Sequence, residues 1–275
     1  MKITILIDNS TLSSDLVSEH GFCAFIEESN KKILFDTGEE GNLIANADKL
    51  GIDLTDLDYI VFSHGHYDHT CGLCYLLEMY KERGLEKYPI IIAHSKAFYS
   101  KIRKGENIGS KLSFQEIKNN FEVILTDKPY SITENLLFLG EVPRKNDFEG
   151  KYSIGFVNID GEDKEDFILD DSALVFKGER GLSVASGCSH SGICNILDYA
   201  IEICKDNRIL NVLGGLHLKN SDEVIINRTI KELIKFNPEK LYACHCTGNL
   251  AYELLEENED IKFIPIGCGF KTQFK

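Results

Sequence analysis

Three features are missing from this 275-residue sequence, and each absence narrows the class of protein. No apolar run is long enough to span a bilayer, and the first two residues lead directly into the strand-like ITILID rather than into the apolar core of a signal peptide. These two absences predict a cytoplasmic protein with no membrane partner. No low-complexity linker divides the chain, so we expect one domain over residues 1–275.

An excess of positive charge is also missing. The chain has 30 Lys and Arg against 44 Asp and Glu, which gives a formal charge of −14. Nucleic-acid binding takes most of its affinity from phosphates that the protein neutralises, and this net field repels them. The composition therefore predicts no nucleic-acid partner and favours a small-molecule one, and it leaves a homo-oligomer open.

The nine cysteines are an odd count spread along the chain, at positions 23, 71, 74, 188, 194, 204, 244, 246 and 268. In a cytoplasmic protein such a set indicates reduced thiols rather than a disulfide framework. The spacing Cys71-x-x-Cys74 is compatible with metal binding or thiol redox chemistry. However, residues 72–80 continue as an apolar helical pattern, which favours simple packing of both thiols.

Short apolar runs alternate with helical patterns along most of the sequence. KITILID, GFCAFIEE, KKILFDTG and DYIVFSH have the β-branched and aromatic residues of strands, and a second strand-rich half follows after residue 172. Two such halves with outer helices predict an α/β fold with two sheets face to face. The less regular residues 95–150 predict a partly helical basic insert, starting with a helix in SKAFYSKIRKGENIGSK. It is either a solvated face or a lid whose cations meet an anionic substrate.

The stretch SHGHYDHTCG places three histidines and one aspartate within six residues, namely His64, His66, Asp68 and His69. One catalytic metal ion takes about three protein ligands, so this density indicates two ions, or one ion with a catalytic acid beside it. In an extended loop, residues two apart point to the same side, so His64, His66 and Asp68 can share one side. Other histidines follow separate apolar strands, and His190 and His245 are the natural distant ligands.

The motif HGHYDH fits the His-x-His-x-Asp-His signature of the metallo-β-lactamase superfamily. The segments LVSEHGFCAFIE, ILFDTG, GEVPR, GCSHSGICNI, GGLHL and ACHCTG extend this resemblance to the branch of dihydropterin–ribofuranosylaminobenzene phosphate synthase-like proteins, over residues 16–248. The resemblance implies a four-layer αβ/βα sandwich of two facing mixed sheets with helices outside. It also implies one or two divalent metal ions along one edge of the sheets, zinc first, with manganese or iron as alternatives.

The resemblance also implies roles for individual residues. His64 and His66 would hold the first ion, and Asp68, His69 and His245 would hold the second. Asp36 of ILFDTG would orient a metal-bound histidine through a hydrogen bond. Many relatives carry a bridging aspartate after the strand that here ends in Gly187-Cys188, and this sequence has no carboxylate there. We predict His190 as the replacement, and the alternatives are Cys188, Asp171 and His217.

The segments GCSHSG and CHCTG each join a predicted strand to a predicted helix. The backbone N–H groups of Ser191, Gly192, Thr247 and Gly248 are therefore candidates for binding an anion at a helix N-terminus, although ordinary capping by Ser191 or Thr247 explains the same residues. Together with Arg144 and the basic stretch, they favour a phosphate-bearing substrate.

The function predicted from the sequence is that of a metal-dependent enzyme on a phosphate- or pyrophosphate-bearing small molecule. It would be a hydrolase or a dihydropterin phosphate synthase-like transferase, in which Asp68 orients the nucleophile or accepts its proton. Two alternatives use the same ligand set. One is an iron-dependent redox enzyme for oxygen or persulfide chemistry, and the other is a non-catalytic metal or ligand sensor.

Overall fold

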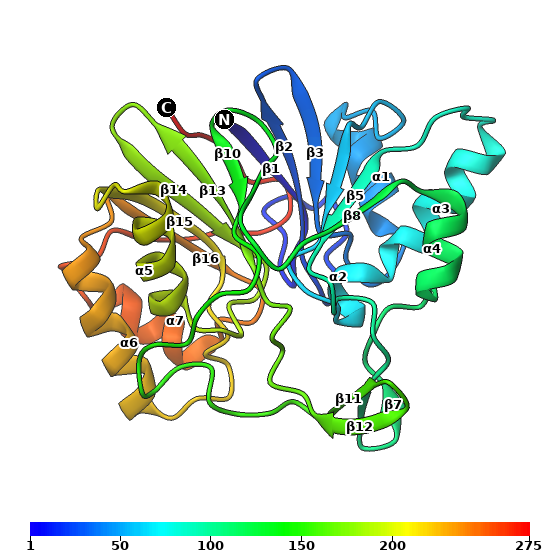
Figure 1. Cartoon of the computed structure of the whole chain (residues 1–275). Helices are drawn as coiled ribbons and strands as arrows, with labels where there is room; N and C mark the ends of the chain where they lie inside the picture. Colours follow the sequence, from blue (N-terminus) through cyan, green and yellow to red (C-terminus); the bar gives the residue numbers. More distant parts are fainter.

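Two seven-stranded mixed sheets face each other at the centre of the molecule (Figure 1). The computed structural model describes residues 1–275. The first sheet has the order β18 (Lys271–Gln273), β1 (Lys2–Ile7), β2 (Cys23–Glu28), β3 (Lys31–Phe35), β4 (Tyr59–Val61), β5 (Ile90–Ala93) and β8 (Val123–Leu125). The second has the order β17 (Phe263–Pro265), β16 (Lys240–Cys244), β15 (Ile209–Gly215), β14 (Gly181–Ser186), β13 (Ala173–Gly178), β10 (Leu136–Phe138) and β9 (Tyr130–Ser131).

Helices cover the outer face of each sheet, as Figure 1 shows. The first sheet carries α1 (Asn42–Leu50), α3 (Gly72–Glu82) and α4 (Phe114–Asn120), and the second carries α5 (Ile193–Cys204), α6 (Glu223–Phe236) and α7 (Asn249–Glu256). Each helical layer buries an apolar cluster against its sheet, and a third cluster of 20 residues lies between the sheets. The four-layer αβ/βα sandwich predicted from the resemblance is therefore confirmed. None of these helices combines the length and the apolar character that a membrane span needs.

The predicted helix at the start of the basic stretch is wrong. Residues 101–107 form a hairpin of β6 (Lys101–Arg103) and β7 (Glu106–Asn107). In a small third sheet, β6 pairs with β11 (Phe156–Ile159), which in turn pairs with β12 (Glu162–Glu165). Lys104 and Gly105 both have positive φ, at 52° and 83°. Two consecutive left-handed residues form the type I′ turn that closes a two-residue hairpin and interrupts a helix.

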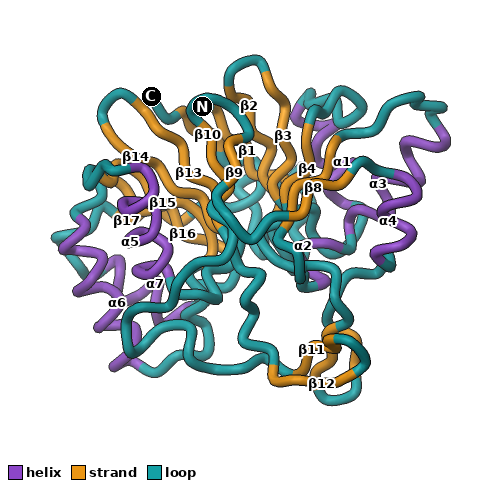
Figure 2. The backbone as a smooth tube through the Cα atoms, in the orientation of Figure 1, coloured by secondary structure: helices purple, strands orange, loops and turns teal.

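Residues 95–150 also do more than form an insert. After the hairpin, α4 packs on the first sheet, β8 extends that sheet, and β9 and β10 extend the second. The segment therefore carries the chain from one half of the sandwich to the other. The part that stands away from the sandwich is the small sheet at the lower end of the molecule in Figure 2.

The loops that follow β3, β4, β14, β15 and β16 gather at one edge of the two sheets (Figure 2). In the first sheet β3 runs parallel to β4, and in the second sheet β14, β15, β16 and β17 run parallel to one another. This brings the carboxyl ends of these strands to the same edge. The loop after β4 passes very close to a neighbouring backbone there. A Cβ added at Gly65 would lie 1.7 Å from the carbonyl oxygen of Ala97.

Replacing Gly65 by Ala is expected to displace this loop and to cost about 1–3 kcal/mol of unfolding free energy, as overpacking does. Gly109→Ala is the matched control, because a Cβ at Gly109 would have no neighbour closer than 3.4 Å. Denaturant unfolding measures both. An equal, small effect for the two variants would show that the close approach at Gly65 does not constrain the loop.

Candidate metal centre

Three histidines from opposite sheets converge on one point. His64 and His66 follow β4, and His190 precedes α5; α2 (Tyr67–Thr70) begins directly after His66. His64 Nε2 lies 3.0 Å from His66 Nδ1 and 3.1 Å from His190 Nε2. The prediction that the loop histidines would meet His190 from the second half of the chain agrees with this geometry.

The hydrogen bonds around His64 fix its tautomer. The Ser63 hydroxyl donates its proton to Asp36 Oδ2 at 2.6 Å, so its oxygen accepts from His64 Nδ1 at 3.0 Å. His64 Nε2 is then a bare lone pair aimed at the other two rings. Such a nitrogen is suited to bind a cation.

A second set consists of His69, His245 and Asp68. His69 Nδ1 donates to Asp36 Oδ2 at 2.7 Å, and His245 Nδ1 donates to the amide oxygen of Asn9 at 3.0 Å. That oxygen also accepts from a backbone N–H, and the Asn9 amide nitrogen donates to the His245 carbonyl, so the orientation of the Asn9 amide is fixed.

The Nε2 atoms of the two rings face each other, and without a metal ion the raised pKa of His69 keeps a proton on one of them at neutral pH. These atoms are only 3.2 Å apart, and Asp68 Oδ2 lies 3.4 Å from His245 Nε2 and 3.7 Å from His69 Nε2. The close contact needs a positive charge between the two Nε2 atoms and the carboxylate, and a metal ion that displaces the His69 proton can supply it. The residues present thus fit a second ion.

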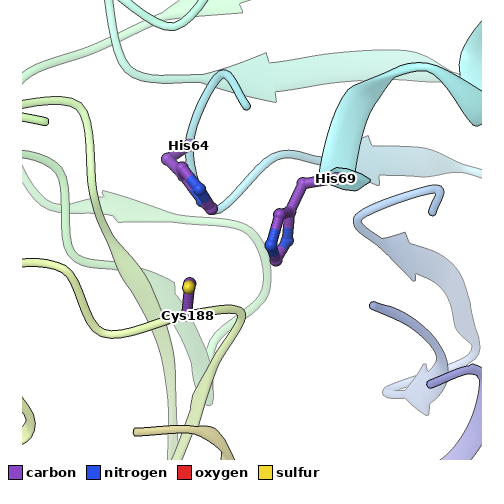
Figure 3. Close-up of side chains that lie close together, drawn as sticks. All are labelled: His64, His69 and Cys188. Carbon is purple, nitrogen blue, oxygen red and sulfur yellow. The ribbon is translucent and has the colours of Figure 1, made fainter. Parts of the chain in front are cut away.

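Cys188 lies between the two sets. Its sulfur belongs to donor groups with His64 and His69, with His190 and His217, and with His245 and Cys246, in each of which the ligand atoms lie within 4.8 Å of one another. Figure 3 shows the sulfur facing the gap between the rings of His64 and His69. It lies where the missing bridging carboxylate was expected, and a thiolate there can contact an ion in either set.

Charge around the second set favours a cation strongly. Burial opposes ionisation of Asp68, but the imidazoles of His69 and His245 outweigh it and lower the pKa of this carboxyl to about 2. Burial also opposes protonation of His69, but the carboxylates of Asp68 and Asp36 outweigh it and raise the pKa of this imidazole to about 9. In the first set burial lowers the pKa of His66 to about 3, which keeps its ring neutral.

An ion cluster behind the loop positions the first set. The Gly65 N–H donates to Asp170 Oδ2 at 2.7 Å. The ammonium of Lys101 bridges Asp170 and Asp166 at 2.7 and 2.9 Å, and all three side chains are buried. Lys101 is therefore not one of the substrate-facing cations that the basic stretch suggested. No motif in the sequence indicated this cluster, because its members lie 65 and 69 residues apart.

The N-terminus of α5 already holds carboxylates of the chain itself. The amide and hydroxyl of Ser191 both donate to Asp171 Oδ2, at 2.8 and 2.6 Å, and the Gly192 amide donates to the Ser189 carbonyl. The next amides of the helix donate to Glu149. The amides of Ser191 and Gly192, which were predicted to bind a substrate anion, thus have acceptors within the protein in this structure. Asp171 likewise faces the helix end, where burial raises its pKa to about 6.

The other predicted anion-binding residues also have internal partners or lie elsewhere. The Thr247 amide and hydroxyl both donate to the Cys244 carbonyl. Arg144 donates to the Ile168 carbonyl at 2.8 Å, and it does not line the cavity over the two donor sets that is described below. Gly248 lines a cavity of about 700 Å³ that also reaches His245.

A cavity of about 270 Å³ opens over the two donor sets. It is lined by His20, His66, Tyr67, Asp68, Arg103, Ile108, Ile154, Cys188, His190, His217, Lys219, Asn220, His245 and Cys246. Arg103 comes from the small sheet and Lys219 from the loop after β15, so these two cations face the site in place of Arg144 and Lys101. A groove of about 360 Å³ with both polar and apolar lining residues adjoins it and shares Arg103, His190 and His217.

Backbone strain is concentrated around the same cavity. Asp36, His217 and His245 have φ angles of 60°, 52° and 54°, in the left-handed region that L-residues rarely adopt. All three follow the ends of strands that meet at the site. Strained residues of this kind gather at functional sites, where the surrounding structure holds them in place.

Comparison with known proteins identifies the family. A family model described as the metallo-beta-lactamase superfamily matches residues 18–197, which is more than half of the chain. The chain belongs to the metallo-β-lactamase superfamily. This confirms the resemblance seen in HGHYDH and its accompanying segments.

Similar proteins match this chain over nearly its whole length. The 7,8-dihydropterin-6-methyl-4-(beta-D-ribofuranosyl)-aminobenzene-5'-phosphate synthase of Methanocaldococcus jannaschii is 32% identical, over 98% of this chain and 95% of its own. An uncharacterised protein of the same organism is 34% identical, over 96% and 98%. The crystal structure of a metal-dependent hydrolase of the β-lactamase superfamily matches with a TM-score of 0.86 at 31% identity, over 100% and 99%.

Metal affinity of the second set should depend on pH. Because the proton on His69 has a pKa of about 9, an ion must displace it at neutral pH. We expect the affinity of this set to rise with pH, by up to about tenfold per unit, until His69 is deprotonated near pH 9. Competition with a chelator of known affinity measures it. Asp36→Asn, which removes a charge that raises this pKa, should flatten the profile, and a flat wild-type profile would contradict the assignment.

The roles of His190 and His217 can be separated by two alanine variants. His190→Ala removes a nitrogen that lies 3.1 Å from His64 Nε2, so it should lower the metal content by one ion per chain. His217→Ala removes a ring that contacts the Cys188 sulfur at 3.3 Å, and it should retain both ions. Metal analysis after dialysis distinguishes them, and the reverse pattern would make His217 the ligand.

Proposed function

We propose that this chain is a metal-dependent enzyme with a two-ion centre that acts on a phosphate- or pyrophosphate-bearing small molecule. The observation that carries the proposal is the pair of facing donor sets, in each of which three ligand atoms lie within 4.8 Å of one another. His64, His66 and His190 would hold one ion, and Asp68, His69 and His245 the other, with the Cys188 sulfur between them. A set of imidazole, thiolate and carboxylate donors suits Zn²⁺ best, with Fe²⁺ and Mn²⁺ as alternatives.

The chemistry follows from the charges that line the cavity. When bound, such ions polarise a phosphoryl or leaving-group oxygen and lower the pKa of a coordinated water. Asp68 stays ionised because of its lowered pKa, so its free oxygen can orient the nucleophile and accept its proton. Asp36 holds His69 in the tautomer that leaves Nε2 free, and it does not touch the substrate.

The cavity and the groove beside it also suit a substrate that has an anionic part and an apolar part. Arg103 and Lys219 line it beside the donor sets, and cations at the mouth of a cavity attract an anion to a chain of formal charge −14. Phe148, Tyr152 and Phe167 line the adjoining groove, which suits an apolar or planar group. A phosphorylated organic molecule fits both regions.

The names of two relatives support parts of this proposal. One is named as a synthase whose product carries a 5'-phosphate, which supports the substrate class, and the other as a metal-dependent hydrolase, which supports the use of metal ions. We propose that the metal centre of this chain activates a leaving group, with water or an organic acceptor as the attacking group to be found by experiment.

The first experiment is a substrate panel run with metal-loaded protein. It contains phosphate monoesters, diesters, organic pyrophosphates and lactones, each with and without an arylamine acceptor. We expect metal-dependent release of phosphate or pyrophosphate from at least one member, and no release by the His64→Ala/His66→Ala double variant. Turnover confined to lactones, or equal turnover by the double variant, would overturn the proposal.

The role of Asp68 is tested by Asp68→Asn, which keeps the shape of the side chain and removes its charge. Since general-base contributions are typically ~10²–10⁴-fold, kcat should fall at least ~10²-fold, while the three histidines of the first set retain their ion. Asp15→Asn, which changes an exposed aspartate, is the matched control. Near-wild-type turnover by Asp68→Asn would show that this carboxylate is structural.

A further inference from the structure

Two thiols meet beside the metal centre although they are 58 residues apart in the sequence. The sulfur atoms of Cys188 and Cys246 are 3.0 Å apart. Cys188 lies in the loop between β14 and α5, and Cys246 in the loop between β16 and α7. No other pair among the nine cysteines has a sulfur–sulfur hydrogen bond.

The surroundings hold both sulfurs in this arrangement. Cys246 Sγ accepts the backbone N–H of His217 at 3.2 Å, and Cys188 Sγ lies 3.3 Å from His217 Nδ1. Gly215 packs behind Cys246, where an added Cβ would lie 2.6 Å from the sulfur. Because a disulfide bond is ~2.05 Å long, the two sulfurs need to approach by roughly 1 Å more to form one.

The pair is also accessible to a small reagent. Both cysteines line the cavity of about 270 Å³, and Cys246 is half-buried rather than fully enclosed. By contrast, the thiols of Cys23, Cys194 and Cys244 are buried in the apolar layers. A two-electron oxidant that enters the cavity therefore meets these two sulfurs together.

We propose that Cys188 and Cys246 are a modification site, at which a two-electron oxidant such as a peroxide closes a disulfide that withdraws Cys188 from the metal centre. The two S–H bonds and the O–O bond break, one S–S bond forms, and the peroxide is reduced to two molecules of water. The withdrawal of Cys188 rests on the proposed function, whereas the cross-link rests on the sulfur–sulfur distance alone.

Cys188 cannot bind a metal ion and form the cross-link at the same time. A sulfur bound to an ion is a thiolate that donates a lone pair, and a sulfur in a disulfide has lost that charge. Bound metal is therefore expected to protect the pair from oxidation. Once the disulfide has formed, the centre keeps its histidines and Asp68 but loses the donor that both sets share.

The cross-link is tested on the full chain, with and without bound zinc, by treatment with diamide, which takes two electrons and two protons from a thiol pair. We expect peptide mapping of the zinc-free protein to show Cys188 joined to Cys246 with the loss of two hydrogens, reversed by dithiothreitol. Zinc should slow the reaction at least tenfold. A cross-link between other cysteines, or nine free thiols after treatment, would overturn the proposal.

The consequence for the centre is tested by zinc content after oxidation. Wild type should lose at least half of its zinc on diamide treatment and rebind it after reduction, and Cys246→Ser should lose none. Cys71→Ser, which removes a thiol of the Cys71-x-x-Cys74 pair, is the matched control and should behave as wild type. Equal loss from Cys246→Ser would refute the withdrawal of Cys188, and the peptide map of wild type tests the cross-link even if that variant does not fold.

If the unoxidised protein binds no zinc, the proposed two-ion centre fails while the cross-link can still be found. If the protein binds zinc but no cross-link forms, the modification site fails alone.

Discussion

The arrangement of the site depends on one constraint, the contact between two imidazole nitrogens that need a positive charge between them. His69 and His245 direct their Nε2 atoms toward each other at 3.2 Å beside an ionised Asp68, because the opposite ring nitrogens donate to Asp36 and Asn9. Such a contact is repulsive without a positive charge between the groups. Since His69 follows β4 and His245 follows β16, a cation here also joins the two sheets. The same cation would thus stabilise this edge of the sheets and take part in the chemistry of the site.

The fold supplies this geometry at the ends of its strands. Asp36 follows β3 and accepts hydrogen bonds from the Ser63 backbone and hydroxyl and from His69, so one carboxylate orients a residue of each donor set. Gly187 allows the second sheet to come close to this carboxylate, because an added Cβ would lie 2.4 Å from Asp36 Oδ2. The left-handed backbone at His245 is held by a hydrogen bond from its N–H to Asp8 Oδ1. Orientation of the rings is therefore determined before any ion or substrate binds.

These features could be predicted from the sequence where the interacting residues lie close together along the chain, and not where they lie far apart. The spacing of His64, His66, Asp68 and His69 is local, so it could be interpreted directly, and the strand-end positions of His190 and His245 indicated where the remaining donors lie. The anion sites at α5 could not be excluded from the sequence, because Glu149 reaches the helix from 45 residues away. The hairpin at 101–107 was mistaken for a helix because its turn depends on only two left-handed residues. From the sequence alone Lys101 is interpreted as a solvated cation, because its partners Asp166 and Asp170 lie far away along the chain.

Location of the ions by anomalous diffraction from crystals of the zinc-loaded protein tests the two-ion centre most directly. The account predicts two peaks: one ~2.0–2.1 Å from His64 Nε2, His66 Nδ1 and His190 Nε2, and another at the same distance from the Nε2 atoms of His69 and His245, with an Asp68 oxygen as third ligand. The Cys188 sulfur should lie between the peaks, within ~2.3 Å of at least one. No peak in the second set, or an ion bound elsewhere with His69 and His245 still in contact, would contradict the account.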